Sequence, residues 1–186
     1  MRLFLAIELE TKIKNALRII QDELKQLGGQ VKWVEPNNLH LTIKFLGDVQ
    51  ETKLEPLKTS LQNTAKKFPS FAMEIAGVGV FPNIDHPNII WVGAKETTGT
   101  LTTLATQIEE ALDSLDFQKE KRGFSAHITI GRVKSFKNIS HLTEKLNTLT
   151  LPNNLRQSVP AVTLFKSTLT PQGPVYEVLA QFHLTP

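Results

Sequence analysis

The stretch His40-Leu41-Thr42-Ile43 recurs in the second half of the chain as His127-Ile128-Thr129-Ile130. Successive side chains of a β-strand point to opposite faces, so residues two positions apart share a face. If each copy is a strand, a histidine and a threonine lie on one face and two aliphatic side chains lie on the other. The aliphatic pair can enter a hydrophobic core, which leaves the histidine and threonine to line a surface or groove.

The segments around the two copies follow the same order along the chain. In the first half, apolar spacing and turn-forming residues predict a strand at 2–9, a helix at 13–27, the first His/Thr strand at 39–46, a helix at 54–68 and strands at 71–80 and 89–92. In the second half they predict a helix at 101–115, the second His/Thr strand at 124–133, a helix at 142–149 capped by Ser140, and strands at 161–168 and 175–183. The two histidines lie 87 residues apart, close to half the chain, which indicates an internal duplication.

This order predicts a single α+β domain over 1–186, built from two pseudo-symmetric lobes. The repeat halves run roughly over 1–92 and 93–186. We expect each lobe to pack helices on one face of an antiparallel sheet. The other faces would then form a central cleft, with one His-x-Thr motif on each wall.

The composition narrows the class of protein. The chain contains no cysteine, so it has neither a disulfide framework nor a cysteine nucleophile. The apolar run at 3–7 is too short for a membrane span or a signal peptide, so we expect a cytoplasmic protein without a membrane partner. The formal net charge of +3 permits an anionic partner but does not by itself indicate nucleic acid.

Two histidines on opposite sides of one phosphorus atom can divide acid–base catalysis between them. A neutral imidazole takes a proton from the attacking water, and a protonated one gives a proton to the departing alkoxide. Threonine hydroxyls can donate hydrogen bonds to the non-bridging oxygens, where negative charge gathers in the transition state. His40 and His127 are therefore the candidate catalytic residues, and Thr42 and Thr129 are the candidate phosphate ligands. The repeat leaves open which histidine is the acid.

A metal site is not expected. The chain has no His-Glu-x-x-His and no Cys-x-x-Cys motif. The three remaining histidines lie in a loop, in the first turn of a predicted helix and next to the C-terminus, namely His86, His141 and His183. We expect neither a metal nor a cofactor.

Two basic residues follow the motifs closely. Lys44 has the strand parity of His40 and Thr42, so it either faces the groove or is a solvated lysine. Arg132 lies five residues after His127, so strict alternation puts it on the opposite face. It reaches the phosphate only if the strand bends or ends near Gly131.

Other residues are candidates for contact with RNA. Lys119, Lys121 and Arg122 precede the second motif and form either a solvated loop or a contact with an RNA backbone. Four aromatic residues near predicted loops could stack on a base or belong to the core: Trp33, Phe81, Phe124 and Tyr176. Tyr176 has the best placement for reaching the cleft.

The chain resembles the two-histidine (2H) phosphoesterases, and within them the RNA 2',3'-cyclic phosphodiesterases, historically called 2'-5' RNA ligases. The resemblance runs almost from end to end, through the opening strand at 2–7, the signatures at 33–47 and 124–132 and the closing hairpin at 164–167 and 173–176. One departure is Ala126, where the family often has proline before the second histidine.

The resemblance implies a bilobal fold and hydrolysis of a terminal 2',3'-cyclic phosphate to a 2'-phosphomonoester. It implies that His40 is the proton donor to the leaving 3'-oxygen and that His127 is the proton acceptor from water. Thr42 and Thr129 would hold the phosphate, and Arg132 would assist. The implied partners are RNA ends with a 2',3'-cyclic phosphate. We also expect Tyr176 to bind the substrate, tRNA fragments to be among the RNA ends, and the protein to be a monomer.

Two alternatives stay open. Because the reverse reaction uses the same groups, the chain could be a 2'-5' phosphodiester ligase or nuclease. It could also be a module that binds RNA ends without turnover, although both intact histidines argue against this.

Overall fold

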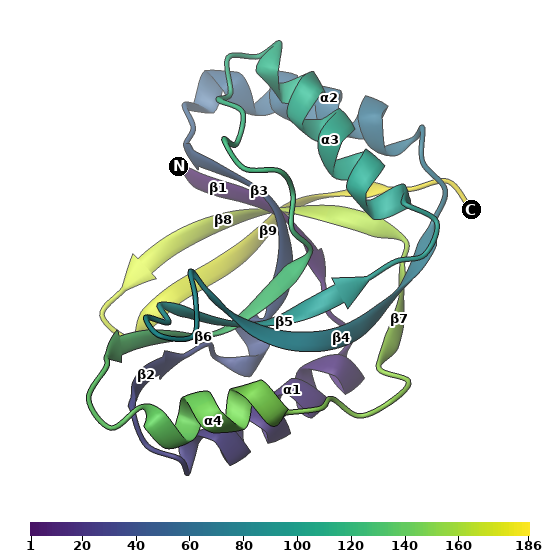
Figure 1. Cartoon of the computed structure of the whole chain (residues 1–186). Coiled ribbons are helices and arrows are strands. Elements are labelled where there is room, and N and C mark those ends of the chain that lie inside the picture. The colour runs from purple at the N-terminus through teal and green to yellow at the C-terminus, as the bar shows by residue number, and fades with distance from the viewer.

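The computed structural model describes residues 1–186, and its nine strands form two sheets (Figure 1). The four-stranded sheet has the order β3-β1-β8-β9, with β3 at His40–Asp48, β1 at Arg2–Glu8, β8 at Ala161–Thr170 and β9 at Gly173–His183. The five-stranded sheet has the order β2-β6-β5-β4-β7, with β2 at Gln30–Trp33, β6 at His127–Ser135, β5 at Ile89–Lys95, β4 at Phe71–Phe81 and β7 at Arg156–Val159. All paired neighbours within the sheets are antiparallel.

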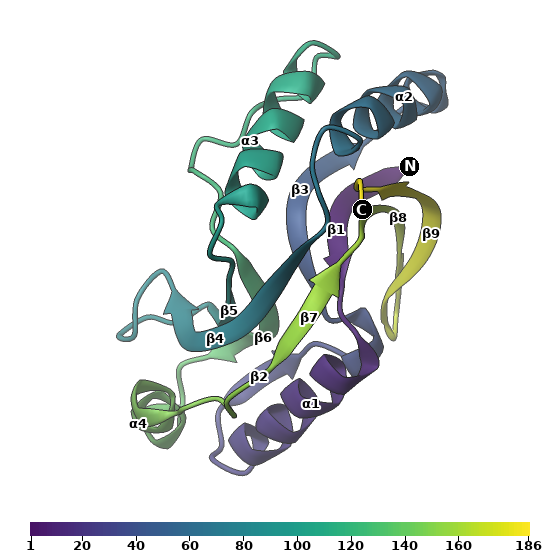
Figure 2. The same cartoon turned by 90° about the vertical axis from the view of Figure 1, so that its right-hand side faces the viewer.

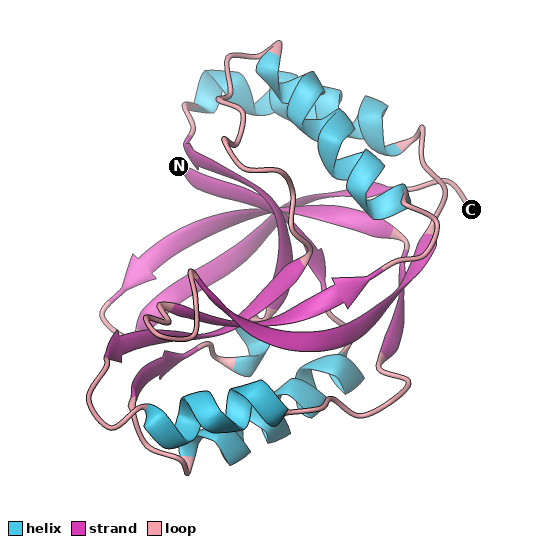
Figure 3. Ribbon diagram, viewed as in Figure 1, coloured by secondary structure: helices cyan, strands magenta, loops and turns pink.

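Four helices flank the sheets: α1 at Thr11–Lys25, α2 at Leu54–Ala65, α3 at Thr100–Asp113 and α4 at Ser140–Thr148. Helices α2 and α3 lie together over the four-stranded sheet, and α1 and α4 lie together over the five-stranded sheet (Figures 1 and 3). Short 3-10 helices precede β3 at Pro36–Asn38 and α2 at Glu51–Lys53. No helix has the length and apolar character needed to cross a membrane.

Both halves of the chain contribute strands to both sheets. The four-stranded sheet combines β1 and β3 with β8 and β9, whereas the five-stranded sheet combines β2, β4 and β5 with β6 and β7. Strand β1 lies between β3 and β8 in the same way as β5 lies between β6 and β4. The helices after these two strands also cross over, because α1 contacts β6 of the other sheet and α3 contacts β3 (Figure 2). Each lobe is therefore assembled from both halves of the chain.

One hydrophobic core of 36 buried residues joins the two lobes. The core face of β1 is formed by Leu3, Leu5 and Ile7, each at most 1% exposed. Helix α1 buries Ile13 and Leu17 with the spacing of three and four that the sequence shows. Since helices and core cover one face of each sheet, the His-x-Thr side chains lie on the opposite face. We call that face of each sheet the site face.

The predicted α+β fold of two lobes, with antiparallel sheets flanked by helices, is confirmed. Two short strands were not predicted, and two local predictions are wrong. Strands β2 and β7, each four residues long, were missed because so short an alternating segment resembles a loop. Strand β6 begins at His127 and not near Phe124. Ser140 is the first residue of α4, and the N-cap position belongs to Ile139 without a side-chain cap.

Candidate active site

The two motif histidines are held by the same contact. Nδ1 of His40 lies 2.7 Å from the carbonyl oxygen of Asn38, and Nδ1 of His127 lies 2.7 Å from the carbonyl oxygen of Ser125. A carbonyl oxygen only accepts hydrogen bonds, so Nδ1 is the donor in both rings. In the neutral form this leaves Nε2 of each ring as a proton acceptor on a half-buried side chain.

A β-bulge follows each His-x-Thr motif at the same position. On β3, Thr42 pairs with Ala6 and Lys44 pairs with Leu5, which leaves Ile43 as an extra residue. On β6, Thr129 pairs with Trp91 and Gly131 pairs with Ile90, which leaves Ile130 as the extra residue. A single extra residue reverses the alternation of side chains beyond it.

The bulge on β3 turns Lys44 away from the site face. Lys44 is only 2% exposed, and its Nζ donates to Glu109 of α3 at 2.7 and 2.8 Å. Neither interpretation of Lys44 drawn from strand parity is therefore right, because the lysine neither faces the groove nor is solvated.

The bulge on β6 has the opposite consequence for Arg132. It puts Arg132 on the site face with His127 and Thr129, where strict alternation had excluded it. Arg132 is exposed and near enough to His40 and Tyr176 for its charge to act on both. The equivalent position on β3 holds Phe45, so the repeat supplies this cation on one wall only.

The two motifs come together at the boundary between the sheets. Strands β3 and β6 belong to different sheets but lie next to each other. Thr42 and Thr129 are both partly exposed on the same face as their histidines. The position of Arg132 close to His40 also links the two motif strands electrostatically. The arrangement therefore offers two imidazoles, two hydroxyls and one guanidinium to a small anion.

Burial dominates the electrostatics of this site. It lowers the pKa of the His40 imidazole, and the charges of Lys14 and Arg132 lower it further, against the opposing effect of the Asn38 carbonyl. Burial also raises the pKa of the Tyr176 phenol, against the effects of Arg132 and Arg2. The Tyr176 hydroxyl thus keeps its proton at neutral pH and can donate a hydrogen bond.

Each histidine also lies among aromatic rings. The His40 ring is 4.8 Å from Phe4 and 5.4 Å from Tyr176, measured between centroids. The His127 ring is 5.2 Å from Phe81 in an edge contact and 6.4 Å from Trp91. Of the four aromatic residues singled out from the sequence, Phe81 and Tyr176 lie beside the histidines, whereas Trp33 and Phe124 pack against the main core.

Sequence reasoning missed several residues of the site face. Phe4 stacks on Phe165 at 5.1 Å, and Trp91 is directly opposite Thr129. Glu8 is opposite His40, and its Oε1 accepts hydrogen bonds from Thr163 and Gln181, each at 2.9 Å. The alternation of β1 contained a signal for Phe4 and Glu8, but nothing in the sequence indicated which face of that strand would carry the site.

The predicted basic segment before the second motif is exposed. Lys119 pairs with Asp113 at 3.2 Å, and Lys121 and Arg122 lie on the same exposed loop. No three histidine, aspartate or glutamate side chains gather in a group able to hold a metal ion.

The Tyr176 hairpin is attached to the first motif. The side-chain amide of Asn38 donates to the carbonyl oxygen of Pro174 at 2.9 Å. This bond joins the segment before His40 to the segment before Tyr176. It explains how a residue of β9, at the far edge of the four-stranded sheet, comes to lie beside the His40 ring.

Comparison with known proteins places this geometry in a family. An RNA 2',3'-cyclic phosphodiesterase of Methanothermobacter thermautotrophicus is 37% identical over 183 residues, which is 98% of either chain. Another of that name from Archaeoglobus fulgidus is 39% identical over 184 residues, covering 98% of this chain and 99% of the relative. A crystal structure of a Thermus thermophilus protein superposes with a TM-score of 0.82 at 28% identity, over 99% of this chain and 98% of that one.

The family model described as "LigT like Phosphoesterase" matches twice, at residues 7–91 and 92–176. Each match contains one His-x-Thr motif. The chain therefore belongs to the LigT-like phosphoesterase family.

Proposed function

We propose that this protein is an RNA 2',3'-cyclic phosphodiesterase, which hydrolyses a terminal 2',3'-cyclic phosphate to a 2'-phosphomonoester. The observation that carries the proposal is the pair of His-x-Thr motifs on neighbouring strands, with each imidazole fixed through Nδ1. The names of relatives that match over nearly the full chain support the choice of substrate.

In the proposed reaction, water attacks the phosphorus atom and the bond from phosphorus to the 3'-oxygen breaks. His127 takes a proton from the attacking water, and His40 gives a proton to the departing 3'-oxygen. The products are a free 3'-hydroxyl and a phosphate that remains on the 2'-oxygen. One proton enters the protein and one leaves it, so the two histidines exchange protonation states and reset through solvent.

The other site residues stabilise charge. Thr42 and Thr129 donate hydrogen bonds to the non-bridging oxygens, and Arg132 balances the negative charge that grows there. The protonated Tyr176 hydroxyl is a further donor on the His40 side. The Phe4 and Phe81 rings offer faces or edges against which a nucleoside can pack.

His40 must be protonated to act as the acid, although its pKa in the free protein is lowered. The negative charge of the bound cyclic phosphate counteracts this lowering of the His40 pKa. A phosphate anion next to an imidazole favours the charged form and raises the pKa. Substrate binding therefore loads His40 with the proton that it later delivers.

The proposal extends to the setting of the reaction. The substrate is an RNA end, with tRNA fragments as one source, and the protein acts as a cytoplasmic monomer without a metal or cofactor. Exposed Lys121 and Arg122 on the loop before the second motif suit contact with an RNA backbone.

The test uses a short RNA with a terminal 2',3'-cyclic phosphate, incubated with the protein in EDTA. We expect a 2'-phosphomonoester, identified by its phosphorus NMR spectrum and by its resistance to a 3'-specific phosphatase. The His40→Ala and His127→Ala proteins are expected to be inactive while still folded. Full activity in either variant would refute the proposal.

The same mixtures distinguish the alternatives. Binding of the cyclic end without product would indicate a binding module. Addition of an RNA with a 5'-hydroxyl, followed by formation of a 2'-5' bond, would indicate a ligase. Activity that disappears in EDTA and returns with a divalent cation would indicate a metal-dependent enzyme.

A further inference from the structure

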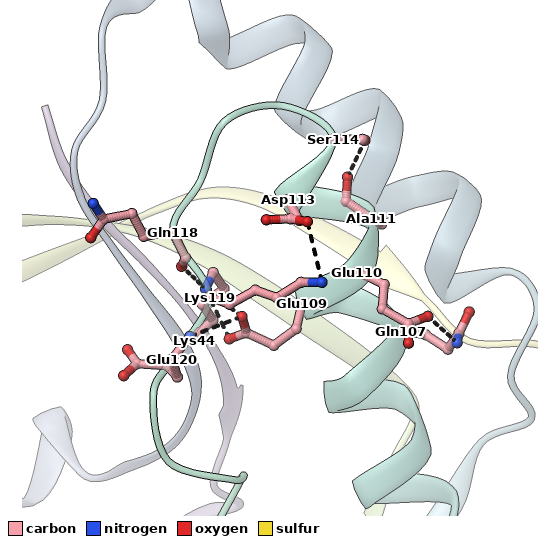
Figure 4. A network of polar contacts seen from close by, with 10 residues as sticks. All are labelled: Lys44, Gln107, Glu109, Glu110, Ala111, Asp113, Ser114, Gln118, Lys119 and Glu120. Carbon is pink, nitrogen blue, oxygen red and sulfur yellow. Dashed lines mark hydrogen bonds and ion pairs between the residues drawn. The ribbon is translucent and has the colours of Figure 1, made fainter.

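Lys44 forms a buried connection between three segments of the chain. Its ammonium group donates to both oxygens of Glu109 on α3 and, at 2.7 Å, to the carbonyl oxygen of Gln118 (Figure 4). The Glu109 carboxylate also accepts the backbone N–H of Glu120 at 3.3 Å. The Lys44 side chain is 1% exposed and that of Glu109 is 20% exposed. The lysine therefore joins β3, α3 and the loop 114–126 at one point.

A second polar side chain makes a comparable connection in the lobe of the five-stranded sheet. Gln21 of α1 is 1% exposed, and its amide nitrogen donates to the carbonyl oxygens of Val34 and Ile130, each at 2.8 Å. Ile130 is the bulged residue of β6, and Lys44 directly follows the bulged residue of β3. Each connection thus begins at the bulge of one motif strand.

Each connection ends on the segment that leads into the other motif. Val34 lies between β2 and the start of β3 at His40, and Gln118 lies in the loop that leads to His127. Strands β3 and β6 are in different sheets, so no ladder of backbone hydrogen bonds fixes one against the other. The two buried connections contribute to that alignment, Gln21 beside the backbone bond from the Val34 N–H to the Ile130 carbonyl oxygen at 3.0 Å, and they cross between the motifs.

We propose that Lys44 with Glu109, and Gln21, are positioning residues that set how the two His-x-Thr strands face each other. The proposal rests on the proposed function, because it concerns the alignment of the two histidines about one phosphorus atom. None of these three side chains lies on the site face. Their effect is on catalysis and not on contact with substrate. Two-sided acid–base chemistry requires both imidazoles in place at once, whereas binding of an anion tolerates a small displacement of one wall.

The test compares kcat and KM for a nucleoside 2',3'-cyclic phosphate in Lys44→Met and Gln21→Met. Methionine keeps the approximate length of each side chain and removes its donors. We expect kcat to fall at least about tenfold, while KM and the inhibition constant of inorganic phosphate stay within about twofold. Lys145→Met is the control for the loss of a lysine that joins two elements through an ion pair, here an exposed one. Its Nζ lies 2.6 Å from Glu23, but this pair joins α4 and α1 without a motif strand, so we expect unchanged kinetics.

A double variant separates positioning from stability. Lys44→Met leaves Glu109 without its partner, which destabilises the fold, whereas Lys44→Met with Glu109→Leu removes both charges and restores much of the stability in urea. The connection to Gln118 is still absent, so we expect kcat to remain low. Recovery of kcat together with stability would overturn the proposal, and so would unchanged kcat in folded single variants.

One readout does not depend on activity. A crystal structure of the double variant is expected to show the loop 114–126 and the start of β6 displaced from β3. An unmoved loop would overturn the proposal. An inactive wild-type protein would refute the proposed function alone, since this structural comparison would still decide on the positioning role.

Discussion

At the scale of single residues, the burial of His40 determines a pH dependence. Burial, Lys14 and Arg132 lower the pKa of His40 from its ordinary value of 6.5. As the pH rises, His40 of the free protein therefore loses its proton with a midpoint below pH 6.5. If His40 is the proton donor, kcat/KM falls as pH rises through this lowered pKa. The basic limb of kcat, which reports the substrate complex, lies at higher pH because the bound phosphate raises the pKa.

Rate profiles against pH, together with an NMR titration of His40, check this expectation. Addition of inorganic phosphate should move the His40 titration upward. A His40 pKa at or above 6.5 in the free protein would contradict it. If the His40 titration coincides with the acid limb of kcat/KM instead, His40 is the base and His127 the acid.

Arg132 breaks the symmetry that the repeat imposes on the two histidines. Its equivalent on β3 is Phe45, which is 58% exposed. In Arg132→Met we expect kcat/KM to fall about tenfold to a hundredfold, because a charged partner of the transition state is lost. The pKa of His40 should rise at the same time, since one of the cations that lower it is gone.

Steady-state kinetics and the NMR titration measure these two effects independently. Lys134→Met is the control, because Lys134 is an exposed cation on the same strand. An unchanged His40 pKa in Arg132→Met would show that the guanidinium does not act on His40. Equal losses in the two variants would indicate a general effect of surface charge.

At the scale of elements, the two bulges mark the limit of what the sequence predicts. The helices follow from their own spacing of apolar residues, and the motif strands follow from alternation, so most elements could be assigned. A bulge is defined by the register of a strand against its neighbour, which is information absent from the strand itself. The extra residue Ile43 therefore reversed the expected face of Lys44, and the extra residue Ile130 reversed that of Arg132.

The residue after the bulge on β6 also has a packing role. A Cβ on Gly131 would lie 2.8 Å from Val31, closer than real Cβ contacts, and 3.1 Å from the Trp33 ring, tighter than most of them. Gly131→Ala is therefore expected to destabilise the protein by about 1–3 kcal/mol, because β2 must shift away from β6. Urea unfolding measures this. At Gly123 a Cβ meets nothing within 4 Å, so Gly123→Ala should leave the unfolding free energy nearly unchanged.

At the scale of the whole molecule, the repeated order of elements does not reveal that the two halves of the chain exchange strands between the sheets. Two similar halves could form two separate lobes or could contribute strands to each other's sheets, and the order of elements along the chain is the same in both cases. The structure has the second arrangement, in which β1 lies between β3 of its own half and β8 of the other. The lobes themselves were predictable from the sequence, whereas their composition was not.

This exchange predicts that neither half folds alone. A fragment of residues 1–92 would keep β1 and β3 but lose β8 and β9, so β1 would expose the edge at which Leu5 pairs with Leu164. A fragment of residues 93–186 would contain β6 with only residues 93–95 of its neighbour β5. Each fragment would also leave its share of the common core unburied.

We therefore expect each fragment to lack a cooperative unfolding transition by circular dichroism. An equimolar mixture should regain both the transition and turnover of a cyclic phosphate, since the motifs come from different fragments. A fragment that unfolds cooperatively by itself would show that one half is a self-sufficient lobe, contrary to the interleaved sheets.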